Sequence, residues 1–63
     1  MKYSELKKIL KKNGCIFRHE GKRHEIWYSF KTDSEFPVGR HNTQDVAPGT
    51  LKAILKQAGI ESF

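Results

Sequence analysis

The chain has 63 residues, a formal net charge of +5 and 30% charged residues. A chain of this length is expected to form a single domain, residues 1–63, with a small core and little stability to spare for an elaborate cofactor pocket. The basic balance predicts nucleic acid as the leading partner, with an acidic protein or an anionic membrane as alternatives. The sequence has no apolar run long enough for a secretory signal or a membrane span. The single cysteine, Cys15, allows no internal disulfide, so we expect a reducing, cytoplasmic location.

A helix is predicted over residues 3–13, with Ser4 as its N-cap. Asn13 and Gly14 end it, and Gly14 suits a left-handed conformation. Four apolar residues recur at helical spacing and form the expected core stripe: Tyr3, Leu6, Ile9 and Leu10. Four lysines are expected on the other side: Lys7, Lys8, Lys11 and Lys12. This lysine face is either a solvated surface or a phosphate- or partner-binding face.

Three short strands are predicted next, over residues 15–20, 24–30 and 35–40, joined by polar turns. Cys15 is expected to be buried. Pro37 lacks a backbone donor, which favours an edge position for the third strand.

Strand alternation leaves one question open in the second strand. His24 shares a face with the more apolar set, which continues with Ile26, Tyr28 and Phe30. Trp27 lies on the other face. If the apolar set packs on the helices, Trp27 is exposed and available to stack on a base or anchor a partner; core packing is the alternative.

A second helix is predicted after a polar loop over residues 41–47. Pro48 fits its first turn, although Thr50 is an alternative cap. Its expected buried stripe consists of Leu51, Ile54, Leu55 and Ala58. Gly59 ends the helix, Ile60 packs back on the last turn and Phe63 frays. The order α-β-β-β-α predicts an α+β fold, a three-stranded antiparallel sheet with both helices on one face, which resembles the double-stranded-RNA-binding domain.

The main candidates for chemistry lie at the predicted turn after residue 20 and at the start of the second predicted strand. Histidine is the residue type suited to take or give a proton near neutral pH, and His24 follows Lys22 and Arg23, which are suited to hold phosphate groups. The alternative for His24 is an ordinary surface histidine.

Lys52 and Lys56 lie one helical turn apart and either contact phosphates or face solvent. His19 is expected to decorate the first strand. The cysteine and histidine spacings do not match a structural zinc pattern, and no metal or cofactor is expected.

Four segments together resemble a HicA-type toxin, the ribonuclease half of a bacterial toxin–antitoxin pair. They are Ser4-Glu5-Leu6 with Asn13-Gly14, His24-Glu25-Ile26-Trp27, Arg40-His41, and the block from Pro48 to Ile60. The resemblance implies a metal-independent endoribonuclease that cuts messenger RNA, with its catalytic histidine at His24. It also implies a HicB-type antitoxin as the protein partner. Arg23 and Gly39 stand where the family usually has a small residue and a proline.

The sequence therefore predicts that His24 is the general base of an RNA-cleaving toxin. Six residues are expected to contact RNA phosphates: Lys22, Arg23, Arg40, His41, Lys52 and Lys56. His41 is also suited to return the proton to the leaving group, or it only holds the loop. The alternatives are an RNA-binding module that does not cut RNA and a degenerate toxin that only binds its partner.

Overall fold

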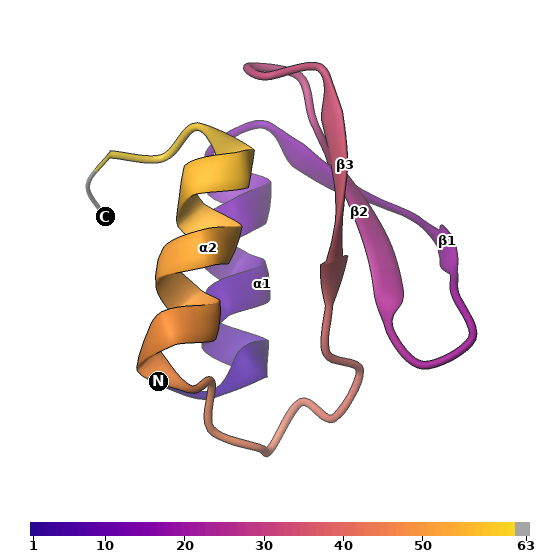
Figure 1. Ribbon diagram of the computed structural model, residues 1–63, viewed down its shortest axis with the longest axis vertical. Helices are drawn as coiled ribbons and strands as arrows, with labels where there is room; N and C mark the ends of the chain where they lie inside the picture. Colours follow the sequence, from indigo (N-terminus) through magenta and orange to yellow (C-terminus); the bar gives the residue numbers. More distant parts are fainter. Residues whose placement is uncertain (62–63) are drawn as a thin grey trace.

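The computed structural model describes residues 1–61 and shows one antiparallel sheet with both helices on one face (Figure 1). The elements are α1 (Tyr3–Lys12), β1 (Cys15–Glu20), β2 (Glu25–Ser29), β3 (Ser34–Val38) and α2 (Pro48–Ala58). This confirms the predicted α+β order. The strand order β1-β2-β3 places β3 at an edge, as Pro37 predicted. Phe63, expected to fray, lies outside the described residues.

The ends of the two helices match the predicted glycines and Pro48, but Ser4 is not the N-cap of α1. Gly14 and Gly59 adopt positive φ angles of 83° and 76° after α1 and α2. Ser4 does not cap α1; the first two amides of the helix instead donate to the backbone carbonyls of Gln44 and Asn42, each at 3.1 Å. The loop after β3 thus supplies the acceptors that an N-cap side chain would otherwise provide. At α2, Pro48 is the first helical residue, and Thr50 lies inside the helix.

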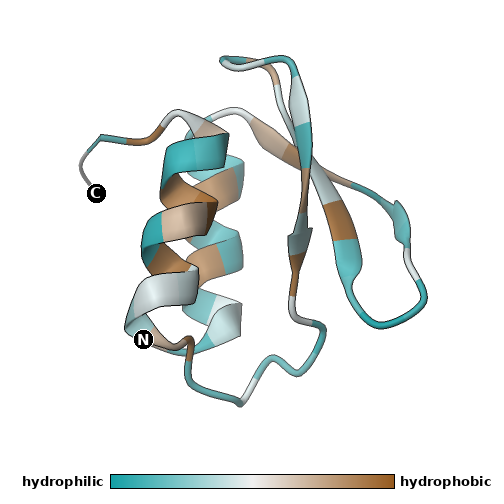
Figure 2. Cartoon of the chain, viewed as in Figure 1, coloured by the Kyte–Doolittle hydropathy of each residue, from teal (hydrophilic) through white to brown (hydrophobic). Residues whose placement is uncertain are grey.

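One apolar core lies between the sheet and the helices. Hydrophobic and hydrophilic segments alternate along both helices (Figure 2), which is typical of helices with one buried face. The buried apolar residues form one cluster: Leu6, Leu10, Cys15, Trp27, Phe36, Val38, Val46, Ile54, Ala58 and Ile60. Four further residues from the predicted stripes are partly buried against it: Tyr3, Ile9, Leu51 and Leu55.

The structure decides which face of β2 packs on the helices. Trp27 is 2% exposed, whereas Phe30, from the apolar set, is 65% exposed. An exposed Trp27 is therefore excluded. Ser29 is also fully buried, and its hydroxyl donates to the Ala58 carbonyl at 2.7 Å. The inward face of β2 can bury polar atoms because these atoms form hydrogen bonds there. The alternation of apolar and polar residues in the sequence does not reveal such hydrogen bonds.

Lys7 departs from the predicted lysine face, because it is buried while Lys8, Lys11 and Lys12 are exposed. Its ammonium nitrogen lies 3.1 Å from Oε1 of Glu25 and donates to Oδ1 of Asn42 at 2.6 Å. A lysine can occupy such a position because its long aliphatic stem packs on apolar surface while the ammonium reaches polar partners.

A close contact at Gly39 follows the end of β3, which stops at Val38 rather than at the predicted Arg40. A Cβ atom added at Gly39 would lie 2.8 Å from Cζ of Tyr3, closer than carbon atoms approach without a shift. We therefore expect Gly39→Ala to lower the free energy of unfolding by about 1–3 kcal/mol, as overpacking does, measured by urea denaturation. Gly49→Ala is the control, since no heavy atom lies within 4 Å of its added Cβ. Equal stability of the two variants would contradict this packing argument.

Candidate active site

The turn between β1 and β2 presents His24 to solvent. The Gly21 amide donates to the His24 carbonyl at 2.8 Å and closes the turn. β2 begins at Glu25, one residue later than predicted. Lys22, Arg23 and His24 are all exposed. The imidazole is therefore accessible to a ligand and has two basic neighbours in the chain.

A second basic segment, Arg40-His41, lies at the same end of the sheet. Glu25 of β2 pairs with Val38 of β3. The two strands are antiparallel, so the residue before Glu25, His24, and the residue after Val38, Gly39, both lie beyond this pair at the same end of the sheet. The turn after β1 and the loop after β3 both lie at the lower end of the sheet in Figure 1. Both are largely hydrophilic in Figure 2. His41 is exposed there.

Arg40 connects these two segments. Its Nη2 donates to the Gly21 carbonyl at 2.7 Å and lies 3.6 Å from Oε1 of Glu20. Within residues 1–61, its Nε is buried and has no hydrogen-bond partner. Arg40, predicted to contact phosphate, thus holds the turn that carries His24.

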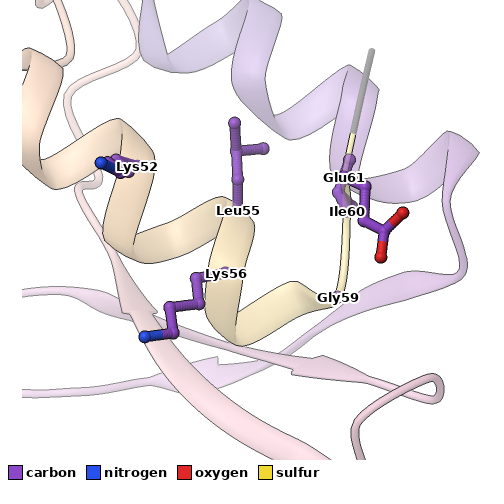
Figure 3. Close-up of a pocket in the computed structure, with 6 residues that line it drawn as sticks. All are labelled: Lys52, Leu55, Lys56, Gly59, Ile60 and Glu61. Carbon is purple, nitrogen blue, oxygen red and sulfur yellow. The ribbon is translucent and has the colours of Figure 1, made fainter.

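Lys52 and Lys56 are placed apart from the histidine turn. Both are exposed on α2 and line a hollow of about 480 Å³ together with Leu55 and residues 59–61 (Figure 3). The residues that line this hollow include none from the β1–β2 turn. The structure groups five predicted site residues at one end of the sheet, while these two lysines line a hollow on α2 to which none of the five belongs.

Other candidate residues lie in the core or on the strands rather than in the two basic segments. Trp27 is in the core, where its indole N–H donates to Oε1 of Glu25 at 3.0 Å. His19 is exposed on β1, with Nδ1 3.3 Å from the Glu20 carbonyl. On the outer face of the sheet, a hydrogen bond to Asp33 raises the pKa of Tyr28 above its ordinary value. Within residues 1–61, no hydrogen bond or ion pair joins the side chains of these residues to that of His24, although the partner of Trp27, Glu25, is the next residue in the chain.

The sequence analysis missed the contacts made by Lys7, Glu25 and Asn42. Lys7 stands among exposed lysines, and helical spacing placed it on their face. Glu25 and Asn42 are polar residues at the start of a strand and in a loop, where such residues are usually solvated. No local pattern distinguishes them, because the contacts join residues 18 to 35 positions apart in the chain.

Comparison with protein families establishes the family to which this chain belongs. The family described as "HicA toxin of bacterial toxin-antitoxin" matches residues 3–60, which include all five elements and both basic segments. The chain belongs to the HicA toxin family. Comparisons with curated proteins and with solved structures gave no significant match. Membership in the HicA family confirms the resemblance that the four sequence segments indicated, and it implies an antitoxin partner. No helix within residues 1–61 of this HicA chain is long and apolar enough to cross a membrane.

Proposed function

We propose that this HicA chain is a cytoplasmic endoribonuclease that cuts messenger RNA, with His24 as its general base. The observation that carries the proposal is the exposure of His24 in a closed turn directly after Lys22 and Arg23. An accessible imidazole is suited to proton transfer near neutral pH. The adjacent cations are suited to hold the phosphate beside it.

The proposed reaction uses the nucleophile that RNA itself carries. His24 removes the proton of a ribose 2′-hydroxyl, and the oxygen attacks the adjacent phosphorus. The bond from phosphorus to the 5′-oxygen breaks, which leaves a 2′,3′-cyclic phosphate and a 5′-hydroxyl. Lys22 and Arg23 stabilise the charge that builds on the phosphoryl oxygens.

The leaving 5′-oxygen needs a proton. His41 is the candidate donor because it is exposed at the same end of the sheet as His24. Alternatively, His41 contacts the phosphate. Arg40, whose guanidinium already bonds to the turn, would contact RNA only through the part of that group that remains accessible. Lys52 and Lys56 would contact phosphates only of an RNA long enough to reach α2.

Product analysis tests this function. The purified chain is expected to cut RNA in the presence of a chelator, to leave 2′,3′-cyclic phosphate ends, and to spare DNA of the same sequence. A 2′-deoxy substitution at a mapped cleavage site is expected to block cleavage there. Intact RNA with salt-sensitive binding would instead indicate an RNA-binding module. Cleavage of the DNA or of the 2′-deoxy site would contradict attack by the ribose hydroxyl.

The proposed protein partner is a HicB-type antitoxin that covers His24. The net charge of +5 favours acidic groups on the partner, which would also speed association. The same cleavage assay tests occlusion, since a purified complex is expected to be inactive. A complex as active as the free chain would contradict it.

A further inference from the structure

One buried ammonium group joins the two segments that carry the exposed histidines. Lys7 Nζ lies 3.1 Å from Oε1 of Glu25, the residue after His24. The same nitrogen donates at 2.6 Å to Oδ1 of Asn42, the residue after His41. We call this set of three residues, Lys7, Glu25 and Asn42, the Lys7 bridge.

We propose that Lys7 is a positioning residue that sets the geometry of His24 relative to His41. The proposal rests on the proposed function, because relative placement matters only if both histidines act on one RNA phosphate. In this role Lys7 does not contact the imidazole ring of His24 or of His41, and it acts through Glu25 and Asn42.

The Glu25 end of the bridge is fixed from the core. Oε1 of Glu25 accepts the indole N–H of Trp27 at 3.0 Å, in addition to its contact with Lys7. The side chains of Lys7 and Glu25 are only 10% and 18% exposed. Because Trp27 is in the core, the carboxylate cannot move far without breaking this partly buried hydrogen bond.

The Asn42 end is fixed by α1. The carbonyl of Asn42 accepts the Ser4 amide at 3.1 Å, while its side chain accepts from Lys7. On the other side of His41, Arg40 donates to the carbonyl of Gly21 at 2.7 Å. The backbone is therefore held on both sides of His41, and the His41 ring itself is exposed.

A buried ion pair is poorly explained as a device for stability alone. Apolar residues of similar volume are often as stabilising, because desolvation of the two charges offsets their attraction. The bridge does, however, give α1, β2 and the loop after β3 one shared contact point. Placement of this kind matters in catalysis, where a shift of about 1 Å can lower the rate about 100-fold.

The double variant Lys7→Met/Glu25→Gln tests the proposal. It removes both charges together, so neither is left buried alone, and the introduced amide keeps an oxygen that can accept the Trp27 N–H. We expect a folded protein whose RNA cleavage shows a kcat lower by about 10- to 100-fold with a nearly unchanged KM. The amide NMR resonances of residues 24, 41 and 42 are expected to shift. Lys8→Met/Glu35→Gln is the matched control, with the same substitutions at exposed positions.

A kcat equal to that of the wild type in the folded double variant would overturn the proposal. If the wild-type chain cuts no RNA, the proposed function itself fails. Unchanged amide resonances at residues 41 and 42 in the double variant would then overturn the role of the Lys7 bridge.

If the double variant does not fold, Asn42→Ala removes only the loop contact and is expected to lower kcat in the same direction. Its control is Thr43→Ala, an exposed neighbour in the same loop. Equal kcat for these two single variants would also overturn the proposal.

Discussion

His24→Gln is expected to cut RNA about 10²–10⁴-fold more slowly than the wild type, because an amide cannot accept the ribose proton as imidazole does. The substitution keeps a polar side chain of similar reach in an exposed turn, so folding is expected to be unaffected. His24→Ala is expected to show a loss of the same order. The measurement is the single-turnover rate on a defined RNA, with growth arrest after induction as the cellular readout.

His19→Gln is the matched control for this experiment. His19 is also an exposed histidine, but it lies on β1 rather than in the turn. Its variant is expected to cut RNA at nearly the wild-type rate. If His24→Gln cut RNA as fast as His19→Gln, the proposed general base would be wrong, even if the chain proved to be a ribonuclease.

Lys7→Met alone is expected to lower the free energy of unfolding by about 3 kcal/mol, because it leaves the Glu25 carboxylate largely buried without its cationic partner. We take the low end of the range for broken buried pairs because Glu25 keeps 18% exposure and its hydrogen bond from Trp27. In a domain this small, each kcal/mol lowers the melting temperature by roughly 4–8 °C. Thermal and urea denaturation measure the effect.

Lys8→Met, at the next position of α1, separates this effect from the loss of any lysine. Lys8 is exposed, so its variant is expected to change stability by less than about 0.5 kcal/mol. Adding Glu25→Gln to Lys7→Met is expected to restore most of the lost stability, since the unpaired carboxylate is removed. Equal stability of the Lys7→Met and Lys8→Met variants would show that the Lys7 pair contributes nothing to the fold.

Much of the fold follows from local features of the sequence. Gly14 and Gly59 stop the two helices because glycine adopts positive φ without strain, and Pro48 starts α2 because its fixed φ suits a first turn. The position of Pro37 indicated the sheet edge. These features depend on residues close together in the chain, which is why their predicted places agree with the structure to within a residue or two.

The sequence by itself determined the order of the elements, the HicA family and the two basic segments with their histidines. Only the tertiary structure decided that Trp27 rather than Tyr28 faces the core, that Lys7 is buried, and that Arg40 bonds to the turn beside His24. The physical reason is that polar groups are buried where distant partners satisfy them. Glu25 meets Lys7 and Trp27, and Ser29 meets Ala58, only after the sheet and helices have packed together.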